Sequence, residues 1–174
     1  MDVFDFLKKA AEPAKPHAIA VDAQPGMIFA PASGQTVPMA ELPDPVFAGG
    51  AMGKTLGVSP DEGLVYAPIS GTVQVAMPHA FGIANDETEV LIHMGVDTVE
   101  MNGDGFEAQV EKGQQVKAGE PLLRFDKCKV AEAGRAGAVT VIVTNTEDLE
   151  ASDKSVVPLA TGSVSAGDPF VSIR

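Results

Sequence analysis

Two turn motifs each occur twice along the chain, and they constrain the fold more than any other feature. The segments FAPASGQTV (29–37) and YAPISGTV (66–73) share Ala-Pro-x-Ser-Gly followed by an apolar run. The segments GQQVKAGEPLLRF (113–125) and GSVSAGDPFVSI (162–173) share Val-x-Ala-Gly-acid-Pro followed by apolar residues. Glycine supplies positive φ angles, and proline fixes the entry to the next segment. The repeats indicate a duplicated architecture; the alternative is that similar turns select similar residues independently.

The segments between these turns are short, apolar and rich in β-branched residues. Turn signals recur roughly every 8 to 12 residues, a spacing typical of an all-β sandwich or barrel. The chain has 18 glycines and 13 prolines, which fits many short strands. Little helix is expected: only 126–137 and 145–153 have the composition for a turn or two of helix.

The first residues differ from the rest. The apolar residues of a possible helix over residues 3–11 are Val3, Phe4, Leu7 and Ala11. One interpretation is an amphipathic segment that makes weak contact with a membrane surface. The other is a frayed tail, because three nearby acidic residues weaken attraction to anionic lipid. We therefore divide the chain into a flexible or amphipathic tail (1–18) and a single domain (19–174).

Composition excludes several classes of protein. The formal net charge of −12 argues against nucleic-acid binding. No apolar run approaches the roughly 18 residues of a membrane-spanning helix, and the N-terminus does not resemble a signal peptide, so we expect a cytoplasmic protein. Cys128 is the only cysteine, which excludes an internal disulfide framework. Neither Cys128 nor His17, in the proline-rich lead-in, is expected to be functional.

A histidine interrupts an apolar run in TEVLIHMGVDTV (88–99). Side chains alternate along a strand, so they separate into two faces. One face carries Val90, Ile92 and Met94, and the other carries Leu91, His93 and Gly95. A glycine beside the imidazole leaves room for another group to approach it.

A second histidine, in PHAFGI, precedes the first by 14 residues. If 85–87 form a three-residue loop, His79 lies opposite His93, and Phe81 lies opposite Leu91. Opposed side chains have Cβ atoms roughly 4.5–5.5 Å apart, so the two imidazoles would touch. A four-residue loop would instead place them on opposite faces of the sheet.

Two neutral imidazoles on an apolar floor are compatible with several roles. A zinc site needs three or four ligands, and acid–base catalysis needs a carboxylate, for which Asp97 is near in sequence. In nucleophilic phosphoryl transfer, one imidazole accepts the phosphoryl group and the other donates a hydrogen bond to its oxygens. Two histidines buried for structural reasons are the remaining possibility.

A resemblance to a known family extends along nearly the whole chain from about residue 26. It rests on the stretches APASGQTV, LPDPVFA, MGKTLGVSP, YAPISGTV, HAF, LIHMGVDTV, GDGF, GQQVKAGEPLLRFD and GSVSAGDPFVSI. The sequence resembles the glucose-type (glucose or N-acetylglucosamine) EIIA components of the bacterial phosphoenolpyruvate-dependent sugar phosphotransferase system. The combination of HMGVDTV with an upstream HAF is the most specific part.

The resemblance implies a fold, a reaction and partners. The fold is a compact antiparallel β-sandwich of the barrel-sandwich hybrid type. His93 is the phosphoryl acceptor and His79 its stabilising partner. The phosphoryl group arrives from phospho-HPr and leaves to a cysteine of the IIB domain of a sugar permease. The group is carried covalently, so no cofactor or metal is required.

The resemblance also implies a docking surface. We expect an exposed apolar patch of Val46, Phe47 and Leu91, with Asp44 and Asp97 at its rim to meet basic residues of HPr. Family members commonly carry threonine two residues before the supporting histidine, where this chain has Met77. The sequence therefore does not predict which group forms a hydrogen bond with the His79 ring.

Three alternatives differ in class. The first is a regulatory module with the same fold, which docks on metabolic or transport proteins according to its phosphorylation state. The second is a zinc hydrolase, which needs a third ligand near the histidines; Asp97 or Asp44 would have to supply it. The third is a biotinyl- or lipoyl-type carrier, but no lysine lies at an apolar-flanked hairpin tip.

Overall fold

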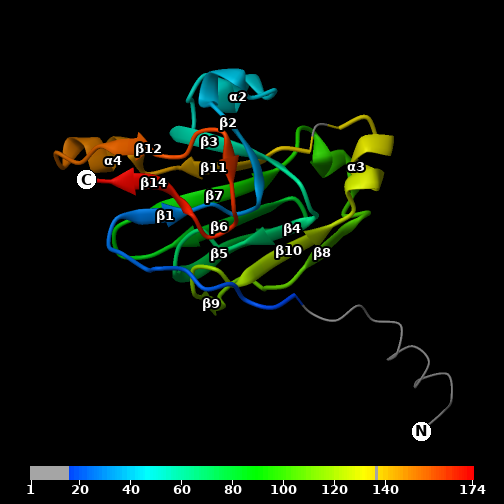
Figure 1. Cartoon of the computed structure of the whole chain (residues 1–174), viewed down its shortest axis with the longest axis horizontal. Helices are drawn as coiled ribbons and strands as arrows, with labels where there is room; N and C mark the ends of the chain where they lie inside the picture. Colours follow the sequence, from blue (N-terminus) through cyan, green and yellow to red (C-terminus); the bar gives the residue numbers. More distant parts are fainter. Residues whose placement is uncertain (1–15, 136) are drawn as a thin grey trace, which may run out of the picture.

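Antiparallel β-sheets form nearly all of the regular structure of the protein (Figure 1). The structure is a computed structural model that describes residues 16–135 and 137–174. Within these residues, all strand pairings are antiparallel. The strands are β1 (Met27–Phe29), β2 (Gly34–Val37), β3 (Lys54–Pro60), β4 (Leu64–Tyr66), β5 (Gly71–Met77), β6 (Ala80–Ala84), β7 (Glu89–Met94), β8 (Phe106–Ala108), β9 (Gln115–Val116), β10 (Pro121–Phe125), β11 (Val139–Val143), β12 (Val156–Pro158), β13 (Ser163–Val164) and β14 (Pro169–Ile173).

The strands form one large sheet and two small ones. The large sheet has the order β13-β2-β3-β11-β7-β6-β5-β9, and the small ones have the orders β1-β14-β12 and β4-β10-β8. One hydrophobic core joins all three, with Ile28 and Phe170 from the first small sheet, Leu123 from the second, and Phe81 and Ile92 from the large one. This arrangement confirms the predicted all-β sandwich.

The strand order also confirms the predicted duplication. The pairs β1–β14 and β2–β13 of one half correspond to the pairs β4–β10 and β5–β9 of the other. The two halves of the large sheet meet where β7 pairs with β11. The first repeated motif spans β1–β2 and β4–β5, and the second spans β9–β10 and β13–β14. Similar sequences therefore occupy equivalent places in the two halves.

The Ala-Pro-x-Ser-Gly loops also contact each other directly. The N–H of Phe29 donates to the carbonyl of Pro68 at 2.9 Å, and the N–H of Tyr66 donates to the carbonyl of Pro31 at 2.8 Å. Each loop ends in a glycine because another part of the backbone comes too close to leave room for a Cβ atom. A Cβ atom at Gly71 would lie 2.4 Å from the carbonyl oxygen of Ala84, closer than real Cβ contacts.

The helices are short. The predicted helical segments contain α3 (Lys127–Glu132) and α4 (Thr146–Ala151), and the Asp126 carboxylate caps α3 by accepting the N–H groups of Cys128 and Lys129. The structure adds α2 (Pro45–Ala48) and two 3-10 turns, η1 (Met39–Glu41) and η2 (Thr98–Met101), which have too few residues to give a helical period. The candidate membrane-contacting segment (3–11) lies outside the described residues. None of the described helices is long and apolar enough to cross a membrane.

The contact between the halves generates a stability prediction. Ile92 pairs with Val141 at this contact and is 2% exposed. Replacing it by alanine leaves a cavity, and Ile92→Ala should lower the free energy of unfolding by about 2–5 kcal/mol in urea titrations. Val99→Ala is the control, because Val99 is 56% exposed and its truncation should cost less than about 0.5 kcal/mol. Equal losses for the two variants would contradict this account of the core.

Candidate functional site

The β6–β7 hairpin places His93, and its register differs from the predicted one. Residues 85–88 form a four-residue loop, so Ala80 lies opposite His93 and Gly82 opposite Leu91. The predicted pairs His79–His93 and Phe81–Leu91 are therefore wrong by one residue.

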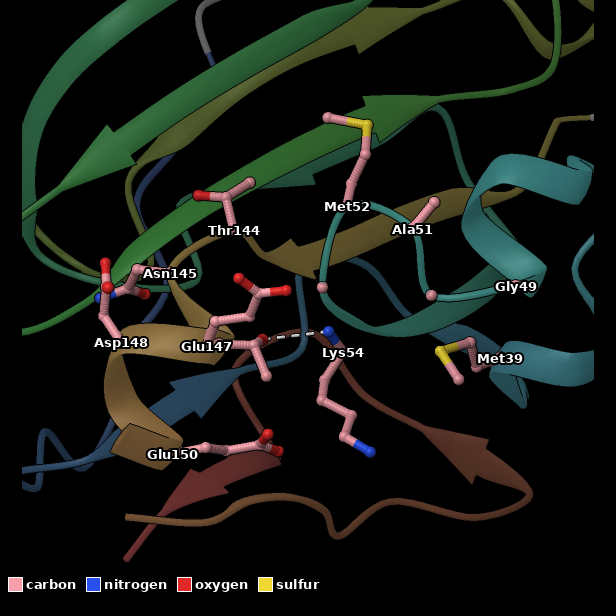
Figure 2. A pocket seen from close by; sticks show the side chains of 13 residues that line it. Met39, Gly49, Ala51, Met52, Lys54, Thr144, Asn145, Glu147, Asp148 and Glu150 are labelled. Carbon is pink, nitrogen blue, oxygen red and sulfur yellow. Dashed lines mark hydrogen bonds between the residues drawn. The ribbon is translucent and has the colours of Figure 1, made fainter. Parts of the chain in front are cut away.

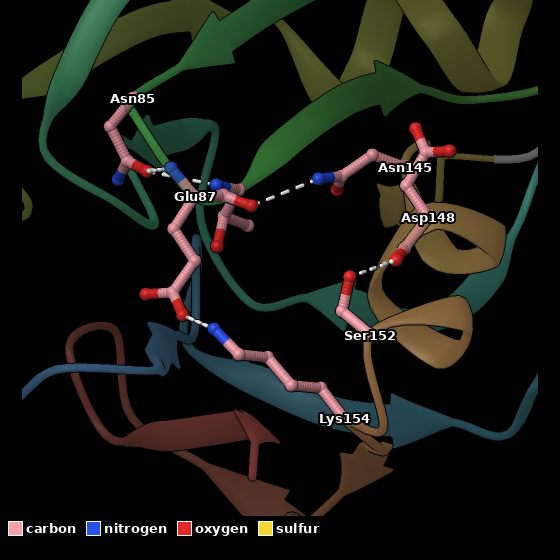
Figure 3. Close-up of polar contacts among 7 residues, drawn as sticks. Asn85, Glu87, Asn145, Asp148, Ser152 and Lys154 are labelled. Carbon is pink, nitrogen blue, oxygen red and sulfur yellow. Dashed lines mark hydrogen bonds and ion pairs between the residues drawn. The ribbon is translucent and has the colours of Figure 1, made fainter.

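The side chain of Asn85 explains this register (Figure 3). Its Oδ1 accepts the N–H groups of Glu87 at 3.0 Å and Thr88 at 2.9 Å. The backbone N–H of Asn85 also donates to the carbonyl of Thr88. These bonds include Thr88 in the turn and so extend the loop from the three residues expected to four.

The two imidazoles meet in spite of the four-residue loop. His79 lies outside β6, in the two-residue Pro78–His79 turn that joins β5 to β6. Its carbonyl accepts the N–H of Met94 at 2.8 Å, and its ring centroid lies 5.5 Å from that of His93, at an interplanar angle of 76°. The prediction that a four-residue loop would place the two histidines on opposite faces is wrong. Side chains alternate strictly between faces only within a strand, and His79 lies in a turn.

The predicted alternation along β7 is confirmed. Val90, Ile92 and Met94 are each 2% exposed and lie in the core. Leu91 and His93 are half-buried on the other face. The cross-strand neighbours of His93 on that face are Ala80 and Thr140. The small side chain of Ala80 leaves space beside the imidazole.

Helix α2 forms one wall of the site. Its N-cap is Asp44, whose carboxylate accepts the N–H of Val46 at 2.9 Å. Phe47 packs against Ile142 on the outer face of the sheet, and its ring centroid lies 5.0 Å from that of His93. Phe47 is only 6% exposed, so its expected place in an exposed patch is wrong: the helix turns this side chain onto the sheet. Val46 is 46% exposed, as a docking residue would be.

Both site imidazoles favour the neutral form. Burial, the largest cause, lowers the pKa of His93, and the neighbouring charge of His79 lowers it further. The backbone of Gly95 and the charge of Asp44 act in the opposite direction. Burial also lowers the pKa of His79. Nδ1 of His93 is buried.

The segment after His93 carries the remaining predicted residue. Asp97 begins η2 in a left-handed conformation, with φ of 52°, and its Oδ2 lies 3.8 Å from Nη1 of Arg135. Sequence reasoning missed this arginine, and it did not predict the exposure of two apolar side chains, Met77 at the end of β5 and Val99 in η2. Their exposure depends on tertiary packing; only the position of Met77, two residues before His79, was visible in the sequence.

The pockets and possible metal ligands in other parts of the described chain can be compared with the histidine pair. A pocket of about 620 Å³ lies between 49–54 and α4, with Glu147 and Met52 on its walls, but neither histidine lines it (Figure 2). Over residues 16–135 and 137–174, no group of three or more His, Cys, Asp or Glu side chains is placed to hold a metal ion. The third ligand that a zinc hydrolase needs is thus not found there. Cys128 and His17 are both exposed.

Comparisons with known proteins agree with this geometry. Residues 26–149 match the family model described as phosphoenolpyruvate-dependent sugar phosphotransferase system, EIIA 1. The PTS system glucose-specific EIIA component of Bacillus cereus is 42% identical over 137 residues, which cover 77% of this chain and 83% of that protein. The PTS system glucose-specific EIICBA component of Staphylococcus saprophyticus is 40% identical over 132 residues, which cover 74% of this chain but only 20% of that protein.

A solved structure is also similar. The glucose permease IIA from Mycoplasma capricolum superimposes with a TM-score of 0.75 at 32% sequence identity, covering 83% of this chain and 93% of that one. The similarity therefore includes most of both molecules.

The pKa shifts generate a prediction for the histidine pair. In an NMR titration, the pKa of His93 should lie below 6.5 and should rise in His79→Gln, because the variant removes a repulsive charge. It should stay below 6.5, since burial is the larger cause. A pKa of His93 that is unchanged by the substitution would contradict the electrostatic contact between the rings.

Proposed function

Since the chain belongs to the EIIA family of the phosphoenolpyruvate-dependent sugar phosphotransferase system, and is thus a phosphocarrier, we propose that His93 carries the phosphoryl group. The observation that supports this assignment is the pair of adjacent imidazoles with lowered pKa values on the outer face of the sheet. Family membership favours transfer over a role confined to regulatory docking.

The burial of Nδ1 directs the reaction to Nε2 of His93. In the neutral ring, a proton on Nδ1 leaves the lone pair of Nε2 free for attack. This lone pair forms a bond to the phosphorus of the donor phosphohistidine. The P–N bond of the donor breaks, and its electron pair returns to the donor imidazole. The lowered pKa of His93 keeps Nε2 unprotonated at neutral pH.

His79 and Phe47 support the carried group in different ways. The neutral ring of His79 donates one N–H to an oxygen of the phosphoryl group, which disperses its charge. The bond from the N–H of Met94 holds the backbone of His79 close to β7, so the residue is near His93 before the group arrives. Phe47, whose ring is in edge contact with that of His93, reduces access of water. A drier site slows hydrolysis of the P–N bond between the two transfers.

We assign the donor and the acceptor by the same family membership. The donor is phospho-HPr, and the acceptor is the cysteine thiolate of a IIB domain, which attacks the phosphorus and returns the electron pair to Nε2. The EIICBA relative carries its EIIA region within one longer protein. Val46, Leu91, Met77 and Val99 would form the apolar contact around the histidines, with Asp44 and Asp97 meeting basic groups of the partner.

The names of the relatives support glucose as the sugar served. Transfer of the phosphoryl group from the donor nitrogen to Nε2 of His93, and from there to a sulfur, needs no redox step and no added nucleophile, so we propose that the carrier works without a cofactor or metal. The proposed exchange of a labile phosphoryl group with HPr supports a cytoplasmic location for the protein.

The transfer role has a direct test. Incubation with phosphoenolpyruvate, enzyme I and HPr should add one acid-labile phosphoryl group to the wild type, as read by intact mass. His93→Gln should accept none, because the nucleophile is lost. His79→Gln should still be phosphorylated, because it retains Nε2 of His93.

His17→Gln is the matched control. It removes the exposed histidine outside the site and should be phosphorylated like the wild type. Phosphorylation of His93→Gln, or a wild type that accepts nothing from cognate HPr, would overturn the assignment.

A further inference from the structure

Arg135 connects two loops beside the reactive histidine. It lies between α3 and β11, and its guanidinium contacts η2: Nη2 pairs with Glu100, and Nη1 lies 3.8 Å from Oδ2 of Asp97. The two loops also share a backbone bond, in which the N–H of Gly95 donates to the carbonyl of Ala138 at 2.7 Å. Arg135 is thus held against the segment that directly follows His93.

Both carboxylates are accessible to a partner. The side chains of Asp97 and Glu100 are 65% and 61% exposed, whereas that of Arg135 is 28% exposed. Nε of Arg135 is buried and has no hydrogen-bond partner in 16–135 or 137–174. The arginine therefore does not form a bidentate salt bridge with either carboxylate, and its longer contact, to Asp97, is the weaker of the two. Exposed pairs of this kind exchange readily with other cations.

The charge at this edge matters for docking. The protein carries a formal charge of −12, and a partner that approaches the acidic rim must present cations. Asp44, on one side of His93, is close enough to raise its pKa. The carboxylates of Asp97 and Glu100, in the segment that follows His93, are already paired with a cation of the protein itself, Arg135.

We propose that Arg135 is a specificity-determining residue for docking, an internal cation that competes with the basic groups of a partner for Asp97 and Glu100. This inference rests on the proposed function, in which basic protein surfaces dock around His93. A partner completes the contact only by displacing the arginine. A basic protein that has no cation positioned to displace Arg135 is therefore attracted less strongly to the acidic rim. Arg135 also weakens the electrostatic attraction between the rim and a partner that does displace it.

The test is the second-order rate constant for phosphoryl transfer from phospho-HPr, measured by rapid quench at low ionic strength. Arg135→Gln should increase it about two- to fivefold, because rim charges act mainly on association. The gain should disappear near 1 M salt, where the Debye length is about 3 Å. Adding Asp97→Asn to Arg135→Gln should remove most of the gain, and Arg135→Lys should stay near the wild type.

Lys154→Gln is the matched control. It removes the same charge from another exposed pair, with Glu87, in the loop at the far end of the β6–β7 hairpin (Figure 3). It should change the rate less than Arg135→Gln does. Equal increases in rate for the two variants would mean that only the net charge matters, and would overturn the proposal.

Two further outcomes separate the proposals. A slower or unchanged rate for Arg135→Gln, with the wild type still phosphorylated, overturns only the role assigned to Arg135. Failure of the wild type to be phosphorylated overturns the proposed function itself. Thermal unfolding of each variant shows whether a lower transfer rate is caused by misfolding. If Arg135→Gln is misfolded and Arg135→Lys transfers slowly, Arg135 has a structural role and the proposed competition is wrong.

Discussion

The pairing of β7 with β11 is the interaction on which the rest of the structure depends. It joins the two halves of the large sheet, with Ile92 opposite Val141 at its centre. On the inner side, the paired side chains are at most 2% exposed, so hydrogen bonding and apolar burial act together. On the outer side, the same pairing places His93 beside Thr140. The imidazole proposed to carry the phosphoryl group is therefore attached to a paired central strand, which would suit a group that has to be presented in one orientation.

The two halves have equivalent strands but different outer faces. Thr55 pairs with Ile142 in one half as Ala80 pairs with His93 in the other, so Ile142 occupies the position that corresponds to His93. A two-residue turn joins β5 to β6, whereas 38–53, with η1 and α2, joins β2 to β3. Figure 1 shows this longer segment with α2. Its Phe47 packs against Ile142 and against His93. One half thus supplies the two imidazoles, and the other supplies α2, which forms one wall of the site.

Much of this was predictable because it depends on local patterns. The repeated glycine turns predicted the duplication, and the period of two along β7 predicted which side chains face the core. The hairpin register was not predictable in the same way, since a few hydrogen bonds made by Asn85 decide it by a single residue. Phe47 was misplaced because a four-residue helix has no detectable period. The contacts of Arg135 depend on loops that are 35 residues apart in the chain and meet only in the folded protein.

We propose that fold and burial leave one nitrogen, Nε2 of His93, to carry the phosphoryl group. This assignment can be tested by ¹⁵N NMR of the phosphorylated, ¹⁵N-labelled protein, in which the nitrogen bonded to phosphorus shows a phosphorus coupling. The coupling is expected at Nε2 of His93, with Nδ1 still protonated. A coupling at Nδ1, or at a nitrogen of His79 or His17, would contradict it.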